Sequence, residues 1–390
     1  METINEYGTI HIEPYYGSLG SMLKRFDRYA RRDCFQGQTV EEFELWRKDA
    51  RKLLAHLLGV DKLERPAKLE YDLLESTELP GGIVREKLLL QTDNEGLQGN
   101  PFMQDFQENP ARPLTGNRKK AYMPVYILIP PKERIKGVFL ALPGHRGAGK
   151  YSVAGRYDIP AVKEKIDFFH YDYGMKLCEL GYVAVCPDCR GFGERRDEVL
   201  FGDTADKFIA GSCRNLANMA IPMGLTVIGL CVYDYMVLID YLYERGEWDL
   251  TKLGCLGFSG GGMQTMYLSA LDDRISQSVI SGYFYGFRDS LMILNDNCSC
   301  NYVPGLWEHF DMGDILSLFA PKPVLIQSCR NDHLNGPRGL VNVTEQLAIL
   351  KNNYALFGAI ERIVHDIREG EHCFHVEPLA GVLATFQKYI

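Results

Sequence analysis

Residues 257–262 read Gly-Phe-Ser-Gly-Gly-Gly, and this glycine-rich segment constrains the fold more than any other part of the sequence. An apolar run from Leu253 to Phe258 leads into it, and a predicted helix from Met263 to Leu271 follows it. The pattern predicts a buried strand, a very tight turn with Ser259 at its tip, and a helix. Side chains two positions before and after the serine would collide where strand and helix approach, so glycine is needed there. The same pattern also fits a turn that only packs, so the rest of the sequence must decide whether Ser259 is reactive.

Apolar runs alternate with helical patterns along most of the chain. The predicted buried strands lie at residues 137–142, 182–186, 253–258, 278–281, 323–327 and 362–367. Predicted helices cover residues 168–179, 225–246, 263–271, 343–357 and the end of the chain from residue 377. Strands that are continuously apolar and alternate with helices are typical of a parallel sheet covered on both faces. We therefore predict an α/β fold with a mostly parallel central sheet, whose ligand site lies at the carboxyl ends of the strands.

A helical arm is predicted before this sheet. Thr39 and Glu42 form a capping box, apolar residues then recur on one face, and Gly59 closes the helix. We divide the chain into an N-terminal helical arm, residues 1–63, and a large domain, residues 64–390. Short strands are predicted at residues 67–74, 83–91 and 121–128, and loop excursions at residues 92–120, 194–223 and 283–312. We expect the arm to dock on the large domain, and a subunit interface in a homo-oligomer is the alternative.

Composition and charge narrow the class of protein. Apolar residues make up 46% and charged residues 24% of the 390 residues, as in ordinary globular proteins. The net charge is −8 and no basic run is present, so we expect no nucleic-acid partner. We expect no membrane partner either, since no uncharged apolar stretch reaches about 18 residues.

The cysteines indicate a compartment. The chain has 11, an odd number, and several lie inside apolar runs, so we expect buried thiols in the cytoplasm rather than a disulfide framework. The first residues do not resemble a secretion signal. Cys298 and Cys300 have no further ligands at zinc-site spacing, and we predict no cofactor and no metal.

A serine hydroxyl becomes a nucleophile only beside a base, and the base needs an acid that orients it. Asp332 follows the predicted strand 323–327, and His372 follows the predicted strand 362–367. Both loops fall at the same edge of the sheet as Ser259. We therefore predict that Ser259, Asp332 and His372 form a catalytic triad.

Other side chains compete for two of these roles. The alternative acids are Asp289 and Asp311, and the alternative histidines are His375, His365 and His333. His375 is the strongest rival because it shares a loop with His372. His365 is expected inside a strand, and His333 adjoins Asp332 and would point away from it.

Two backbone N–H groups should bind the oxyanion of the tetrahedral intermediate. One is that of Gly260, directly after the serine, and the other comes from the loop after the strand 137–142. Either Arg146 or His145 could supply the second group, and we prefer Arg146.

Five segments carry a resemblance to a known family. They are residues 143–147, 187–193, 257–261, 300–305 and 370–374. Together they resemble the dienelactone hydrolase-like branch of the α/β-hydrolases, and within it the bacterial acetyl-xylan-esterase-like proteins. The resemblance covers roughly residues 65–390 and implies an α/β-hydrolase catalytic domain with a Ser259–Asp332–His372 triad.

The resemblance also implies an activity. It implies a serine carboxylic-ester hydrolase that acts through an acyl-enzyme on a small-molecule ester, with short-chain or acetylated carbohydrate esters as substrates. Relatives with a cysteine nucleophile cleave a lactone. Because this chain has Ser259 at that position, we do not expect simple dienelactone hydrolysis. Arg146 stands where many relatives have glycine, which implies that the loop also binds an anionic group. A prolyl-oligopeptidase-like serine peptidase and a non-catalytic binding protein with this fold are the alternatives.

Overall fold

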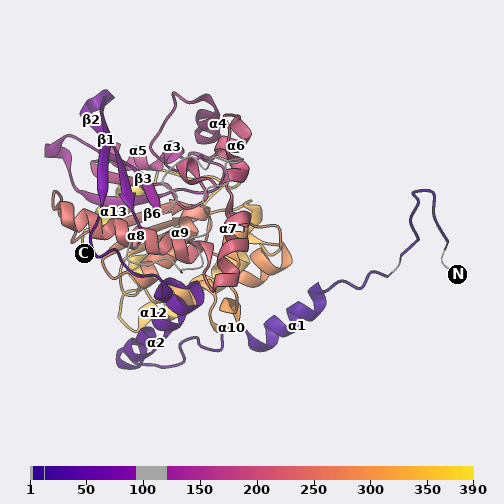
Figure 1. The fold of residues 1–390 in the computed structure, drawn as a ribbon. Coiled ribbons are helices and arrows are strands. Elements are labelled where there is room, and N and C mark those ends of the chain that lie inside the picture. The colour runs from indigo at the N-terminus through magenta and orange to yellow at the C-terminus, as the bar shows by residue number, and fades with distance from the viewer. Residues whose placement is uncertain (1–2, 13, 94–120) are drawn as a thin grey trace.

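The computed structural model of the chain describes residues 3–12, 14–93 and 121–390, and a nine-stranded sheet lies at its centre (Figure 1). The strands are β1 (Tyr71–Leu79), β2 (Ile83–Gln91), β3 (Tyr122–Ile129), β4 (Gly137–Leu142), β5 (Tyr182–Pro187), β6 (Gly254–Phe258), β7 (Gln277–Ser281), β8 (Val324–Cys329) and β9 (Ile363–Arg368). The helices are α1 (Leu19–Tyr29), α2 (Val40–Leu58), α3 (Lys150–Val153), α4 (Pro160–Phe169), α5 (Tyr173–Glu179), α6 (Ala205–Ile209), α7 (Cys213–Ala220), α8 (Val227–Arg245), α9 (Gly260–Leu271), α10 (Leu306–His309), α11 (Met312–Ser317), α12 (Leu340–Ala355) and α13 (Leu379–Phe386).

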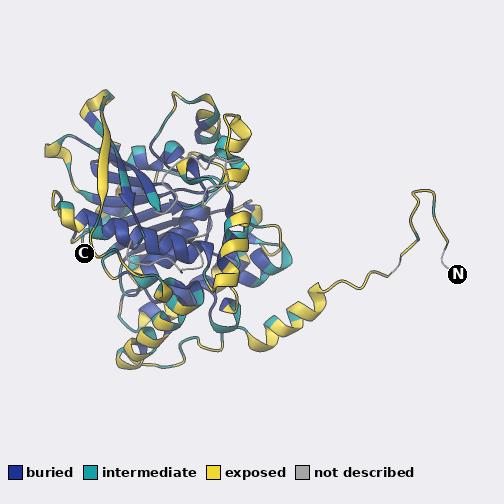
Figure 2. Cartoon of the chain, viewed as in Figure 1, coloured by how far each residue is buried: buried dark blue, intermediate teal, exposed yellow. Residues whose placement is uncertain are grey.

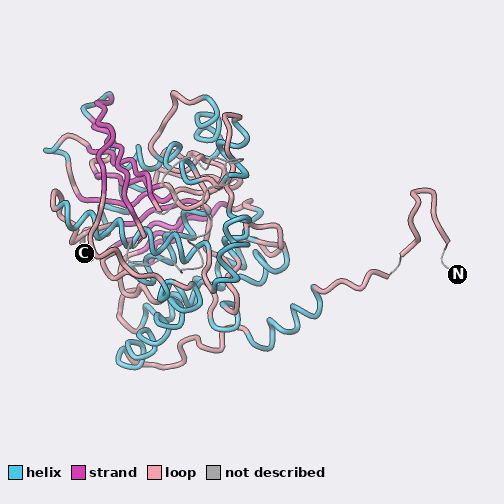
Figure 3. Tube along the Cα trace, in the orientation of Figure 1, coloured by secondary structure: helices cyan, strands magenta, loops and turns pink. Residues whose placement is uncertain are grey.

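The sheet runs in the order β1-β2-β3-β5-β4-β6-β7-β8-β9. The pairs β1–β2, β2–β3 and β3–β5 are antiparallel. The pairs β5–β4, β4–β6, β6–β7, β7–β8 and β8–β9 are parallel. The predicted mostly parallel sheet is therefore confirmed. Figure 3 shows the strands gathered in the middle with helices around them.

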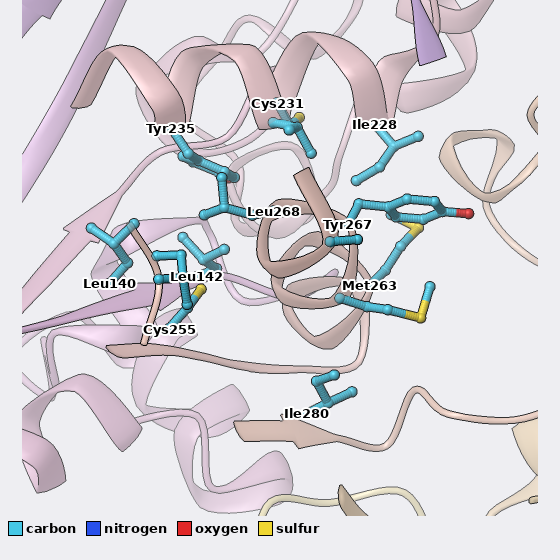
Figure 4. Close-up of a cluster of buried hydrophobic side chains, with 14 of the residues drawn as sticks. Leu140, Leu142, Ile228, Cys231, Tyr235, Cys255, Met263, Tyr267, Leu268 and Ile280 are labelled. Atoms are coloured by element: carbon cyan, nitrogen blue, oxygen red, sulfur yellow. The ribbon is translucent and has the colours of Figure 1, made fainter. Parts of the chain in front are cut away.

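Alternate strand residues enter two separate cores. In β4, Leu140 and Leu142 join one core and Phe139 and Ala141 the other. The first core is covered by α2, α7, α8, α9, α11 and α12, and the second by α3, α4, α5 and α13. Figure 4 shows side chains from α8 and α9 meeting Leu140 and Leu142 in the first core. Figure 2 shows the central strands of the sheet buried, whereas the edge strand β1 is exposed.

The order of the central strands creates a switch point. The chain leaves β4 for β5 on one side and later returns to place β6 on the other side of β4. The helices after β4 cover one face, whereas α9, directly after β6, covers the opposite face. A crevice for a ligand forms where neighbouring connections diverge in this way. The loops after β4 and β6 flank that position.

The helix predicted in the arm is present as α2. Thr39 and Glu42 form the capping box, and Gly59 closes the helix in the left-handed conformation, with φ 78°. Phe43 and Leu54 on its buried face belong to the first core, so α2 packs on the sheet domain. The division at residue 63 stays a prediction.

Helix α1 was not predicted, and none of its residues is buried. Close beyond its end, Nε of Arg31 donates to Oδ2 of Asp314 at 2.7 Å. The ring of Phe26 packs edge-on against Trp307, with centroids 6.2 Å apart. These contacts tie the end of α1 and the residues that follow it to the segment around α10 and α11.

The predicted helix 168–179 is wrong as one element. It is divided between α4 and α5, because His170 adopts a left-handed conformation with φ 57°. Its Nδ1 lies 2.8 Å from the carbonyl oxygen of Phe374, and the N–H of Phe374 donates to Phe169 at 3.0 Å. A tertiary contact with the last loop of the chain thus ends the helix.

The predicted excursions differ in outcome. Of residues 92–120, those from 94 onward lie outside the described residues. Residues 194–223 contain α6 and α7, and residues 283–312 contain a π-helical turn, Arg288–Ile293, and α10. In the described part of the chain no single helix has both the length and the apolar composition to cross a membrane. The segments Cys213–Met223 and Val227–Arg245 have this length and composition only when they are taken together, and the two are bent by 92° relative to each other.

Candidate active site

Ser259 lies at the tip of the turn between β6 and α9. Its backbone has φ 55° and ψ −121°, a conformation that is strained for a residue with a side chain. A Cβ on Gly257 would lie 2.2 Å from the carbonyl of Gly261, and one on Gly261 would lie 2.1 Å from the oxygen of Leu142. Backbone occupies both places, which is why the sequence has glycine at both positions.

The turn is fixed from the neighbouring strand. The N–H of Ser259 donates to the carbonyl of Ser281, the last residue of β7, at 2.9 Å. Phe258 and Gly260 on either side are buried, whereas Ser259 is half-buried. The fold therefore presents this one residue of the turn toward solvent.

His372 and Asp332 form a hydrogen-bonded pair. Nδ1 of His372 lies 2.6 Å from Oδ2 of Asp332, and Asp332 is 4% exposed. The other carboxylate oxygen accepts the N–H of Leu334 at 2.9 Å. Since an ionised carboxylate only accepts hydrogen bonds, Nδ1 carries the ring proton and Nε2 is left as the basic nitrogen.

The His372 ring packs against the end of β6. Its centroid lies 4.5 Å from that of Phe258, the residue before Ser259, with the two planes 34° apart. Gly282 has φ 59°, and a Cβ there would lie 3.0 Å from Cε1 of the imidazole. The ring thus lies between the serine turn and the loop after β7. Among the described residues there is no hydrogen bond between Ser259 and His372, so the structure links the predicted base to the predicted acid but not to the predicted nucleophile.

The rival histidines make other contacts. Nε2 of His375 lies 3.3 Å from Sγ of Cys373, and its Nδ1 lies 3.6 Å from Glu377. His333 is exposed, and its Nδ1 is 3.9 Å from Asp332. His365 lies in β9 beside Ser328, and burial together with Lys351 lowers its pKa to about 4.

The rival acids also have other partners. Oδ2 of Asp289 accepts from Arg338 at 2.6 Å. Asp311 caps α11 and accepts the N–H groups of Phe287 and Met312. His372 is hydrogen-bonded to Asp332 and to neither of these carboxylates, so Asp332 is the acid that the geometry favours.

The loop after β4 lies directly against the serine turn. A Cβ on Gly144 would lie 2.7 Å from the oxygen of Phe258. The buried hydroxyl of Tyr171 donates to the carbonyl of His145 at 2.5 Å. In a trans peptide the next N–H, that of Arg146, points opposite to this carbonyl. Tyr171 therefore fixes the direction of one predicted oxyanion donor.

Gly260 and His145 are neighbours in space. A Cβ on Gly260 would lie 2.5 Å from Nδ1 of His145, so the imidazole borders the residue that should supply the other oxyanion donor. The Arg146 side chain is exposed, and its backbone is left-handed with φ 62°. Its charge is thus available at the rim of the site.

A buried ion-pair cluster holds this loop, and the sequence reading missed it. Nζ of Lys150 lies 2.7 Å from Asp188 and 2.6 Å from Glu194, and its side chain is fully buried. Burial opposes the charge on Lys150, but Asp188 and Glu194 outweigh it and raise the pKa of the ammonium group above its usual range. The only signal in the sequence is Asp188, in the segment 187–193 that carries part of the family resemblance.

Two sulfur-rich clusters flank the site. Ligand atoms of His145, Cys213, Cys298 and Cys300 all lie within 4.8 Å of one another. Those of Cys329, Cys373 and His375 do the same, and Cys373 is the residue after His372. The prediction that Cys298 and Cys300 lack further ligands is wrong, because the fold brings Cys213 and His145 to them.

Comparison with known families gives one match to a family model. The model described as "Abhydrolase family" matches residues 114–335, more than half of the chain. A protein of Bacillus subtilis (strain 168) named "Putative hydrolase YtaP" is 27% identical over 218 residues, which cover 54% of this chain and 67% of that protein.

Solved structures share the fold. The crystal structure of a "putative acetyl xylan esterase" from Bacteroides fragilis NCTC 9343 is 17% identical, with a TM-score of 0.65, covering 97% of this chain and 86% of that one. A glucuronoyl esterase from Solibacter usitatus is 14% identical, with a TM-score of 0.58, covering 92% and 96%. At these identities the likeness shows the architecture.

Proposed function

The chain belongs to the Abhydrolase family and is a hydrolase, and from this premise we propose that it is a serine carboxylic-ester hydrolase acting through an acyl-enzyme. One observation carries the proposal: an imidazole bonded to a buried carboxylate, Asp332, packs on the residue before Ser259. A strained serine at a strand-to-helix turn beside such a pair is the arrangement that acyl transfer needs.

The proposed reaction has two halves. Nε2 of His372 takes the proton of Ser259 as the oxygen attacks the ester carbonyl, and Asp332 stabilises the imidazolium. The N–H groups of Gly260 and Arg146 bind the oxyanion, with the N–H of His145 as the alternative to that of Arg146. The intermediate then expels the alcohol, which takes the proton from His372. Water attacks the acyl-enzyme with the same base, and the acid leaves.

We propose short-chain or acetylated carbohydrate esters as the substrate class. The support is the fold shared with proteins whose names specify acetyl xylan and glucuronoyl esters. The exposed side chain of Arg146, in the loop after β4, adds a cationic group that suits an anionic sugar ester. A small-molecule ester is accordingly the proposed partner.

A panel of esters tests the activity. Short-acyl nitrophenyl esters, acetylated sugars and a methyl-esterified uronic acid are assayed with the wild-type protein and with Ser259→Ala. We expect turnover by the wild type and a loss of at least 10³-fold in the variant. Equal turnover by both proteins would exclude Ser259 as the nucleophile.

Two further assays separate the alternatives. A fluorophosphonate probe should label Ser259, whereas a non-catalytic binding protein would stay unlabelled. Cleavage of proline-containing peptides in preference to every ester would favour the serine peptidase.

The cellular compartment and the oligomeric state of the protein are also proposals. All 11 cysteines are free thiols, which supports the cytoplasm as the compartment. A homo-oligomer stays a prediction that sedimentation can test.

A further inference from the structure

Three distant parts of the chain meet at the loop after β4. His145 comes from that loop, Cys213 from the start of α7, and Cys298 and Cys300 from the segment after β7. Nε2 of His145 lies 3.2 Å from Sγ of Cys300 and 4.0 Å from Sγ of Cys213. The donor set is therefore three thiols and one imidazole nitrogen.

The spacing of these atoms matches a tetrahedral ion site. With Zn–S bonds of about 2.3 Å and Zn–N bonds of about 2.0–2.1 Å, tetrahedral ligands lie about 3.5–3.8 Å apart. The distances of 3.2 and 4.0 Å from Nε2 to sulfur bracket that value. All four donor atoms fall within 4.8 Å of one another.

The cluster is largely enclosed and has a hydrogen-bond donor close to sulfur. Cys213 and Cys300 are buried, Cys298 and His145 are half-buried, and a small cavity of about 10 Å³ borders the cluster. The amide nitrogen of Asn301 lies 3.7 Å from Sγ of Cys300 and donates to the carbonyl of Cys298 at 3.0 Å. The hydroxyl of Tyr283 donates to the other end of that amide at 2.7 Å and so fixes its direction. A donor of this kind orients and stabilises a metal-bound sulfur.

We propose that His145, Cys213, Cys298 and Cys300 bind one Zn²⁺ ion in a closed structural site. Three sulfur donors and one nitrogen donor select Zn²⁺ over the hard cations Mg²⁺ and Ca²⁺, and four protein ligands leave no open position for a reactant. Binding releases the thiol protons to solvent, because the ligands are thiolates. The ion ties the loop after β4, which holds His145 and Arg146, to α7 and to the segment 283–312.

The proposed zinc site would also affect the candidate active site through the imidazole ring of His145. With Nε2 bound to the ion, the proton of His145 resides on Nδ1, which faces Gly260. The ion would thus fix the orientation of a side chain that borders the predicted oxyanion donors, so His145 is a positioning residue here.

Metal analysis of the full-length protein tests the proposal. Protein purified under reducing conditions is loaded with Zn²⁺, dialysed and measured by mass spectrometry of the elements. We expect about one Zn²⁺ per chain in the wild type and at least a tenfold lower content in Cys298→Ser. The matched control is Cys34→Ser, another half-buried thiol outside both clusters, which should keep the ion.

A second variant and a spectrum keep the result interpretable. Cys373→Ser removes a ligand of the other cluster and should also keep the ion. If Cys298→Ser does not fold, Co²⁺ in the wild type should still give the intense visible bands of a tetrahedral thiolate site. A wild type without Zn²⁺ and without those bands, full Zn²⁺ in Cys298→Ser, or loss only in Cys373→Ser would overturn the proposal. None of these readouts depends on ester turnover.

Discussion

Nδ1 of His372 and Oδ2 of Asp332 lie 2.6 Å apart although 40 residues separate them in the sequence. The pair joins the loops after β8 and β9, two adjacent parallel strands whose carboxyl ends lie at one edge of the sheet. The carboxylate of Asp332 holds the ring proton on Nδ1 and leaves Nε2 free for the proposed role of base.

Asp332→Asn should remove most of the activity without unfolding the protein. An amide at this position no longer requires the proton on Nδ1, and it does not stabilise an imidazolium. We expect kcat to fall by about 10³–10⁴-fold, measured with the best ester of the panel. Exchange of the exposed neighbour, His333→Gln, is the control and should change kcat less than threefold. A variant of Asp332 within tenfold of wild type would assign the acid elsewhere.

Tyr171→Phe tests whether the carbonyl of His145 must be held in place. The change deletes only the hydroxyl that donates to this carbonyl, so the neighbouring N–H of Arg146 loses its fixed direction. We expect kcat to fall about tenfold with little change in KM, because the interaction is needed mainly in the transition state.

The matched control for this change is Tyr354→Phe. Tyr354 is also fully buried, and its hydroxyl donates to the carbonyl of Lys322 at 2.7 Å, outside the candidate site. Both variants should lose about 1 kcal/mol of stability in urea unfolding. Equal kcat values for the two variants would show that the bond of Tyr171 is structural only.

Gly261→Ala should disrupt the serine turn. The added Cβ would lie 2.1 Å from the backbone oxygen of Leu142, which cannot move without displacing the end of β4. We expect a loss of about 3 kcal/mol or more in unfolding free energy, or no folded protein. Gly381→Ala in α13 has no atom within 4 Å of its new Cβ and should be neutral or slightly stabilising. Similar stability of the two variants would contradict the steric account.

The glycines of the serine turn show which features of the fold a sequence can predict. The collision of a Cβ on Gly257 with the backbone of Gly261 is local, since strand, turn and helix are adjacent in the chain, and so the turn was predicted with its residues. The collision of a Cβ on Gly261 with Leu142 of β4 is not local and is known only from the structure. The strands β4 to β9 were predicted for the same reason, because each is a short apolar run with turn residues beside it.

Features that depend on distant partners were not predicted. The helix break at His170 needs the carbonyl of Phe374, which is 204 residues away. The contact between His145 and Cys300 spans 155 residues, so spacing along the chain could not reveal a cluster. The loop positions of Asp332 and His372 followed from strand order, but their hydrogen bond is known only from the structure.

His365→Gln should make the protein less sensitive to acid. Burial and Lys351 lower the pKa of His365 to about 4 in the folded state, against about 6.5 in an unfolded chain. Below pH 6.5 the unfolded chain therefore binds a proton that the folded chain does not. His365 contributes stability at pH 7 that is lost as the pH falls toward 4. Because the ring is only half-buried, we expect this loss to be on the order of 1–2 kcal/mol.

Urea unfolding of the two proteins at pH 7 and pH 4.5 measures this contribution. Glutamine can keep a hydrogen bond to Ser328, which lies 3.2 Å from Nε2 of His365, and it carries no titrating proton. The wild type should lose more stability than the variant between the two pH values, and the difference should disappear above pH 7. Since all other titrating groups are common to both proteins, a parallel loss would mean that His365 does not resist protonation in the folded state.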